Sequence, residues 1–153
     1  MIIRDILNLK GNAIFSVAPD GKVADAVAVM VKHDIGSLVV LDGGKMTGML
    51  TFREVLKGVE MQGGNLGALE VRKVMAQPIT CAPGDSLEHL REVMTKNHVR
   101  YVPVEDAGQL LGVISFHDIA KAVIKETNFE NRLLKRYIKN WPEEESAQAP
   151  KTT

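Results

Sequence analysis

Residues 48–54 read GMLTFRE, and residues 112–118, which lie 64 positions further along, read GVISFHD. The same shift aligns residues 14–59 with residues 78–123 without a gap, and 12 of the 46 aligned positions are identical. An internal repeat dictates the architecture, and two copies are too few for a solenoid. The sequence therefore predicts a pseudo-twofold pair, in which each copy covers the apolar face of the other and any site occurs twice.

A short lead-in precedes each copy. Residues 3–7 (IRDIL) resemble residues 71–75 (VRKVM), but the shift between them is 68 instead of 64. The first copy therefore carries four extra residues around positions 10–12.

Composition is that of an ordinary globular protein. The chain has 153 residues, of which 45% are hydrophobic and 25% are charged, so it can bury a core of its own. Lys and Arg together number 19, as do Asp and Glu, and this balance argues against nucleic-acid binding by bulk phosphate attraction. No apolar run approaches the roughly 18–20 residues of a membrane span, and no secretion signal opens the chain. Because Cys81 is the single cysteine, no internal disulfide forms, and we expect a cytoplasmic protein that binds neither nucleic acid nor membrane.

Each copy is expected to run strand, helix, strand, strand, helix, from its hydrophobic periodicity and its Gly and Pro breaks. In the first copy the expected strands are 14–17, 37–41 and 46–50, and the expected helices are 22–33 and 51–61. In the second copy the expected strands are 80–82, 101–104 and 110–115, and the expected helices are 86–97 and 116–125. A further short helix is expected over 66–75. The inward helix faces are expected to include Val31, Leu56 and Val59.

These elements divide the chain into five segments. They are repeat 1 at residues 1–61, a linker at 62–70, repeat 2 at 71–125, an amphipathic helix at 126–141 and a disordered tail at 142–153.

Two helices carry apolar side chains beyond those a single core requires. On the helix 22–33, Ala24, Ala28 and Val29 stand where solvent is expected, so either the rest of the chain or, preferably, a second subunit covers them. The C-terminal helix carries a stripe of large apolar residues, Phe129, Leu133, Leu134, Tyr137, Ile138 and Trp141. For this stripe, packing in a homodimer is favoured over packing on its own module and over docking to a foreign partner.

The two repeated corners, 48–54 and 112–118, carry the chemistry of interest. In each, a hydroxyl residue ends a strand and a carboxylate follows three residues later, in the first turn of a helix. One interpretation is a capping box that only stabilises the helix start. The other is a ligand site, because a helix N-terminus suits a phosphate and the carboxylate can accept hydrogen bonds from a ribose diol. A basic residue before each carboxylate, Arg53 or His117, favours the second interpretation.

Signals of catalysis are weak. The four histidines show no ligand spacing with one another or with Cys81, so we expect no metal site. Residues 63–67 (GGNLG) lack the spacing and the Lys-Ser/Thr of a phosphate loop. No nucleophile and base stand out as a pair, so we expect neither an enzyme nor a required cofactor.

Taken together, the motifs resemble the CBS domain family. The corner G-h-h-T/S-x-x-D (h, apolar), the lead-in VRKVM, the segment TCAP at 80–83 and the strand YVPVED at 101–106 occur in the family's order, and most recur in both copies. The resemblance covers residues 3–125, and the long final helix is similar to that of small stand-alone bacterial CBS-pair proteins. It implies an α+β fold of tandem β-α-β-β-α repeats packed with pseudo-twofold symmetry, usually dimerised through helices.

The resemblance also implies a ligand and its site. The ligand is an adenine nucleotide, AMP, ADP, ATP or NAD, or S-adenosylmethionine, held in two clefts between the repeats. One cleft is expected to combine Ser115, His117 and Asp118 with Ser16, Val17, Ser37 and Leu38. The other is expected to combine Thr51, Arg53 and Glu54 with Thr80, Cys81, Arg100 and Tyr101.

The sequence departs from the family pattern at Glu54, where Asp is usual. The extra methylene moves the carboxylate outward, so the Asp118 site is expected to be the stronger one. Gly36, in the opposite copy, is expected to leave room there for a base.

The leading functional hypothesis is therefore a non-catalytic regulatory module that senses an adenine nucleotide and passes its state to a partner protein. The alternative is a structural or protein-interaction CBS pair with degenerate ligand sites, and Glu54 is its best support.

Overall fold

The computed structural model describes residues 1–11 and 13–140. Two compact units divide the chain, the first running from Met1 to Ile119 and the second beginning at Ala120. The elements, in chain order, are α1 (Ile3–Lys10), β1 (Ser16–Val17), α2 (Val23–His33), β2 (Ser37–Asp42), β3 (Lys45–Thr51), α3 (Phe52–Met61), the 3-10 turn η1 (Val71–Lys73), α4 (Leu87–Lys96), β4 (Tyr101–Asp106), β5 (Gln109–Ser115) and α5 (Phe116–Lys139).

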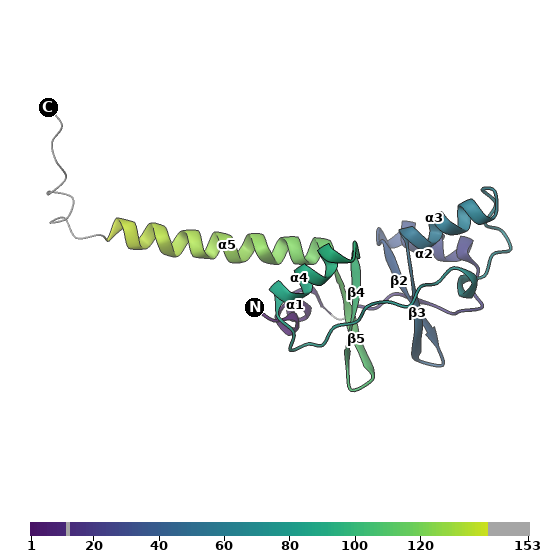
Figure 1. Cartoon of the computed structure of the whole chain (residues 1–153), viewed down its shortest axis with the longest axis horizontal. Coiled ribbons are helices and arrows are strands. Elements are labelled where there is room, and N and C mark those ends of the chain that lie inside the picture. The colour runs from purple at the N-terminus through teal and green to yellow at the C-terminus, as the bar shows by residue number, and fades with distance from the viewer. Residues whose placement is uncertain (12, 141–153) are drawn as a thin grey trace, which may run out of the picture. The chain divides into compact units, whose positions relative to one another are not determined.

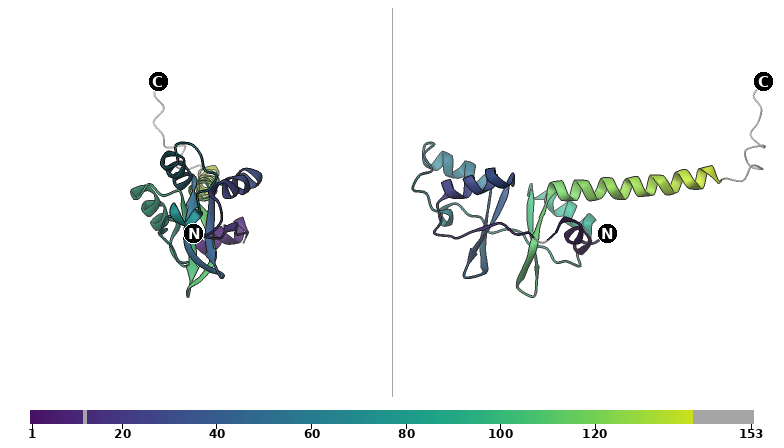
Figure 2. Two further views of the ribbon diagram at one scale, coloured as in Figure 1. Left: turned by 90° about the vertical axis from the view of Figure 1, so that its right-hand side faces the viewer. Right: turned by 180° about the vertical axis from the view of Figure 1, so that it is seen from behind.

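The first unit contains repeat 1 and repeat 2 up to Ile119, each built around an antiparallel hairpin (Figure 2). In repeat 1, β2 pairs with β3 and β1 adds a short parallel strand, while α2 and α3 lie beside these strands (Figure 1). In repeat 2, β4 pairs with β5 in the register that β2 and β3 use, bulge included, because Ser37 faces Thr51 as Tyr101 faces Ser115. The repeated sequence thus produces a repeated fold, as predicted.

The two lead-ins dock reciprocally, each on the other repeat. The amides of Ile3 and Arg4 donate to the carbonyls of Asp85 and Pro83, both at 2.9 Å. In the same way the amides of Val71 and Arg72 donate to the carbonyls of Gly21 and Pro19, at 2.8 and 2.9 Å. Because each lead-in continues into its own copy, this exchange ties the two repeats together.

Side chains of the lead-ins complete the core. Leu69, Val71 and Val74 pack among the buried residues of α2, β2 and β3, and Ile3 and Ile6 of α1 are buried as well. Both corner glycines allow a close approach of a lead-in: a β-carbon on Gly112 would lie 2.9 Å from Leu7, and one on Gly48 would lie 3.0 Å from Met75.

Two expected elements are shorter in the structure. The helix expected over 66–75 is reduced to η1, because the Val71 and Arg72 amides bond to repeat 1 instead of to carbonyls one turn earlier. The strand expected over 80–82 is a single parallel bridge between Cys81 and Val104, since Pro83 has no amide hydrogen with which to extend the pairing.

Three expected core residues are exposed instead. Val31 is 77% exposed, Leu56 69% and Val59 36%. The core of repeat 1 is formed instead by Val23, Ala26 and Met30 of α2 together with Leu69, Val71 and Val74. Ala24 and Ala28 on α2 are exposed too, so the described part of the chain does not cover them.

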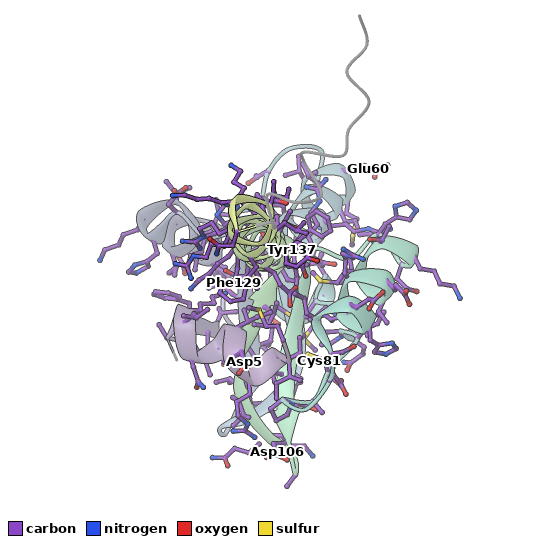
Figure 3. All side chains as sticks on the ribbon, turned by 90° about the vertical axis from the view of Figure 1, so that its left-hand side faces the viewer. Asp5, Glu60, Cys81, Asp106, Phe129 and Tyr137 are labelled. Atoms are coloured by element: carbon purple, nitrogen blue, oxygen red, sulfur yellow. The ribbon has the colours of Figure 1, made fainter. Side chains whose placement is uncertain are left out.

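α5 is one continuous helix, so the expected helix 116–125 runs directly into the C-terminal one. From Ile124 onward its large apolar side chains are exposed by 48 to 67%, among them Phe129 and Tyr137, labelled in Figure 3. Trp141 and the expected tail at 142–153 lie outside the described residues. No helix in the described part of the chain combines the length and the hydropathy that a membrane span requires.

Candidate functional site

The corner of repeat 2 is a complete capping box. The Ser115 amide donates to Oδ2 of Asp118 at 2.8 Å, and the Asp118 amide donates to Oγ of Ser115 at 3.1 Å. The local stabilising interpretation of this motif is therefore correct. It also holds the hydroxyl and the carboxylate in fixed positions beside a cleft.

The corner of repeat 1 is built in the same way but is more tightly closed. The Thr51 amide donates to Oε2 of Glu54 at 2.8 Å, and the Thr51 hydroxyl donates to the same oxygen. Glu54 is only 5% exposed. The longer side chain thus folds back onto its own N-cap residue.

A cavity of about 490 Å³, here called the Ser115 cleft, lies against the corner of repeat 2. Its wall joins that corner to the start of repeat 1, and includes Lys10, Ile14, Phe15, Ser37, Ser115 and His117. This volume lies within the roughly 300–1,000 Å³ of small-molecule sites.

A second cavity, the Thr51 cleft, has a volume of about 670 Å³. It joins the corner of repeat 1, including Thr51, Arg53 and Glu54, to the start of repeat 2 at Pro78 and Ile79. Each cleft therefore combines the corner of one repeat with a segment of the other repeat that follows its lead-in. This segment, here called the lead segment, is residues 13–15 in repeat 1 and 77–79 in repeat 2.

Arg100 and Tyr101 line both clefts. The Tyr101 ring lies directly over Gly36, where a β-carbon would be 1.8 Å from the tyrosine hydroxyl. Tyr101 thus takes the space directly over Gly36, while Gly36 and Ser37 both line the Ser115 cleft, so room for a base beside them stays a prediction. Burial raises the pKa of Tyr101, and the negative charge of Asp118 adds to this against the opposing effect of Arg100, so the phenol stays neutral.

Lys10, at the end of α1, gives the Ser115 cleft a cation. Its ammonium donates to Oδ2 of Asp118 at 2.7 Å and to the Val113 carbonyl at 2.6 Å. Burial raises the pKa of the Asp118 carboxyl, but hydrogen bonds from Lys10 and Ser115 outweigh burial and hold the pKa below its usual range. Asp118 is therefore an ionised carboxylate, 15% exposed, next to the cleft wall.

Six expected site residues do not line either cleft. One is Asp118, which lies next to the wall of the Ser115 cleft and is bonded to Ser115 and Lys10. Leu38 is in the core, Val17 packs against it, Cys81 is buried, Thr80 is exposed away from the cleft, and Ser16 lines a separate hollow beside the hairpin turns. The clefts lie at the end of each hairpin where β2 and β4 begin. Parallel pairing of Ser16 with Val39 and of Cys81 with Val104 carries these residues past that end.

The residues that take their place lie two positions earlier. If the parallel register is extended toward the start of each strand, Ile14 lies opposite Ser37 and Pro78 lies opposite Tyr101. Predicting these residues requires the pairing register of the first strand in each repeat, which local sequence patterns do not specify. Lys10 was not predicted as a site residue, although it belongs to the four extra residues of the first copy.

Cys81 is a buried structural thiol. Burial, with the negative charge of Asp85 adding to it, raises its pKa to about 12. A thiolate is the reactive form, so this side chain is inert at neutral pH. Among the described residues no group of three or more His, Cys, Asp or Glu side chains is arranged to hold a metal ion.

Known proteins resemble this chain in sequence and in fold. The family model of the CBS domain matches residues 3–60 and 71–125. The CBS domain-containing protein CBSX3, mitochondrial, of Arabidopsis thaliana is 30% identical over 146 residues, which cover 89% of this chain and 71% of that protein. The crystal structure of the CBS-domain containing protein ATU1752 from Agrobacterium tumefaciens is 34% identical, has a TM-score of 0.76, and is matched over 80% of this chain and 98% of that one.

A more distant structure shares the fold. The CBS domain pair of protein MJ0100, in complex with 5-methylthioadenosine and S-adenosyl-L-methionine, is 21% identical with a TM-score of 0.72. The match covers 82% of this chain and 98% of that one.

Proposed function

The chain belongs to the CBS-domain family, and on this premise we propose that it is a non-catalytic regulatory module that binds adenine nucleotides in its Ser115 and Thr51 clefts. AMP, ADP, ATP and NAD are the proposed ligands. The observation that carries the proposal is the shared construction of the two clefts, each of which joins a hydroxyl-carboxylate corner of one repeat to the lead segment of the other.

In the Ser115 cleft we assign the phosphate to the start of α5 and to Ser115, and the ribose diol to the Asp118 carboxylate. A helix N-terminus offers free amides to an anion, and an ionised carboxylate accepts hydrogen bonds from two hydroxyls. Ile14 and Phe15 supply apolar wall for the base. The adenosine compounds bound by the MJ0100 pair support this ligand class.

Regulation follows from the position of the ligand. A molecule in either cleft touches both repeats, so its binding favours whichever arrangement of the repeats contacts it better. Coupling of this kind is typically worth about 1–3 kcal/mol. The output passes to a partner protein that recognises the favoured arrangement.

We also propose that the protein is a homodimer. Phe52, Leu56 and Met61 on α3 are 50 to 69% exposed, and the described members of the apolar stripe on α5 are 48 to 67% exposed. Large apolar surfaces of this kind mark interaction sites. Sedimentation equilibrium should give twice the mass of the 16.8 kDa chain. A strictly monomeric protein at micromolar concentration would contradict this.

A thermal-shift screen tests the binding proposal. A ligand at 100 times its dissociation constant stabilises the folded state by about 2.7 kcal/mol. We expect at least one of AMP, ADP, ATP and NAD to raise the melting temperature, and GMP, as the matched control, to raise it less. If no adenine nucleotide raises the melting temperature, the alternative of a structural module is favoured. The closed Thr51–Glu54 corner also supports that alternative. The cytoplasmic location stays a prediction.

A further inference from the structure

The pseudo-twofold symmetry of the clefts is broken at one contact. In repeat 1 the Met49 carbonyl accepts a hydrogen bond from the Ala76 amide at 2.9 Å, so the second lead-in pairs directly with β3. The equivalent carbonyl in repeat 2 belongs to Val113, and it accepts from the side chain of Lys10 at 2.6 Å. A lysine ammonium stands where the other repeat has a backbone amide.

The four extra residues of the first copy explain the difference. They let α1 continue to Lys10, and α1 docks on repeat 2, so the additional turn ends beside the repeat 2 corner. The second lead-in is shorter and ends in strand pairing at Ala76. The wall of the Thr51 cleft therefore has no counterpart of Lys10.

Lys10 already binds the Asp118 carboxylate, which is the group that we assign to the ribose diol. Oδ2 of Asp118 already accepts from the Ser115 amide and from Lys10, so a diol that engages both carboxylate oxygens competes with the ammonium. A neutral nucleoside that displaces Lys10 breaks the ion pair with Asp118 and supplies no anion in exchange. A ligand that carries a phosphate offers the ammonium a new anion.

The charged side chains in the wall of the Ser115 cleft also favour an anionic ligand. Lys10 and Arg100 line the Ser115 cleft, against Asp34 as the one carboxylate among its described lining residues. An ammonium has three N–H donors, of which the contacts with Asp118 and Val113 use two. One donor is therefore left for an anion in the cleft.

We propose that Lys10 makes the Ser115 cleft selective for adenine ligands that carry a phosphate, by exchanging its contact with Asp118 for a contact with that phosphate. The inference rests on the proposed adenine binding and goes further by naming the ligand class. It separates AMP, ADP, ATP and NAD from adenosine, 5-methylthioadenosine and S-adenosylmethionine, which have no phosphate. The Thr51 cleft, whose wall includes Arg53 and Arg100 but no lysine paired with its corner carboxylate, lacks this exchange.

The test is isothermal titration of AMP and adenosine into the full chain and into Lys10→Met. Charge-assisted hydrogen bonds are strong enough that we expect the preference for AMP over adenosine to fall at least about fivefold in Lys10→Met. AMP binds more weakly, while adenosine binds as well as before or better, because its competitor for Asp118 is gone. A merely structural role of Lys10 would weaken both ligands alike, and a smaller fall in the preference would overturn the proposal.

Two controls make the result specific. Lys10→Arg keeps the charge and should keep the preference, as should Lys73→Met, which removes an exposed lysine outside both clefts. In an Asp118→Asn background, Lys10→Met should still weaken AMP but should no longer improve adenosine binding, because the competition for the carboxylate is already gone; an equal gain for adenosine there would overturn the exchange. If melting shows that Lys10→Met is unfolded, Lys10→Gln replaces it.

The same titrations separate the two proposals. If the parental chain binds neither AMP nor adenosine, the proposed function fails. If it binds both and Lys10→Met leaves their ratio unchanged, adenine binding stands and the role of Lys10 fails.

Discussion

Gly36 is the position at which one added carbon tests the arrangement between the two clefts most directly. It is buried at the end of α2, with the Tyr101 ring above its α-carbon. In Gly36→Ala the new methyl group would lie 1.8 Å from the Tyr101 hydroxyl, 2.7 Å from the carbon that bears it and 2.4 Å from Phe52. Ordinary van der Waals contact begins at 3.4 Å, so both rings have to move.

The cost of that movement follows from the neighbours. Phe52 is 50% exposed and can swing into solvent, whereas Tyr101 lines both clefts and has to turn further into one of them. Overpacking of this kind costs about 1–3 kcal/mol. A loss of about 2 kcal/mol lowers the melting temperature of a domain of this size by about 4–8 °C. Backbone strain does not contribute, because Gly36 does not have a positive φ.

Urea denaturation and thermal melting measure the effect, with Gly84→Ala as the matched control. A β-carbon on Gly84 meets nothing within 4 Å, so that variant should keep the parental stability. In a Tyr101→Ala background Gly36→Ala should cost less than about 1 kcal/mol, because the obstructing ring is gone. Equal melting temperatures for Gly36→Ala and the parental chain would refute the placement of Tyr101, as would an undiminished loss in the Tyr101→Ala background.

Three further predictions concern charged and reactive groups. Asp118→Ala should weaken AMP binding in calorimetry more than Glu54→Ala does, because Glu54 is already closed onto its N-cap residue; equal losses would contradict this. The pKa of Asp118 is lowered in the folded state, so its contribution to stability is complete above the unfolded value of about 3.9 and is lost as the pH falls through the folded value. Lys10→Met should therefore raise the pKa of Asp118 in a carboxyl NMR titration, and an unchanged pKa would show that the ion pair is absent in solution. Because the pKa of Cys81 is about 12, its thiol should resist a disulfide reagent at pH 8 until the chain unfolds, and rapid labelling of the native protein would contradict its burial.

Local signals predicted the repeated hairpins and helices well. The apolar periodicity of α2 and α4, and Ser86 as N-cap of α4, are properties of short segments, and the structure confirms them. The Ser86 side chain accepts from the His89 amide at 3.0 Å. Periodicity failed at Val31 on α2 and at Leu56 and Val59 on α3, because it shows which face is apolar but not what covers that face.

The candidate site was predicted only in part, because local patterns do not show which elements pack together. The two corners follow from motifs, the combination of Ser115 with Ser37 was implied by the family resemblance, and both residues line one cleft. The lead-strand residues were placed two positions too late, since only hydrogen bonding between strands fixes a parallel register.

By itself the sequence determined that the chain is a twofold repeat with a hydroxyl-carboxylate corner in each copy, because these features are written in consecutive residues and their spacing. Only the tertiary structure decided that each lead-in docks on the opposite repeat, that Tyr101 lies over Gly36, and that Lys10 meets Asp118 across 108 positions of the chain. Contacts between distant residues depend on how whole elements pack, and local spacing carries no information about that packing.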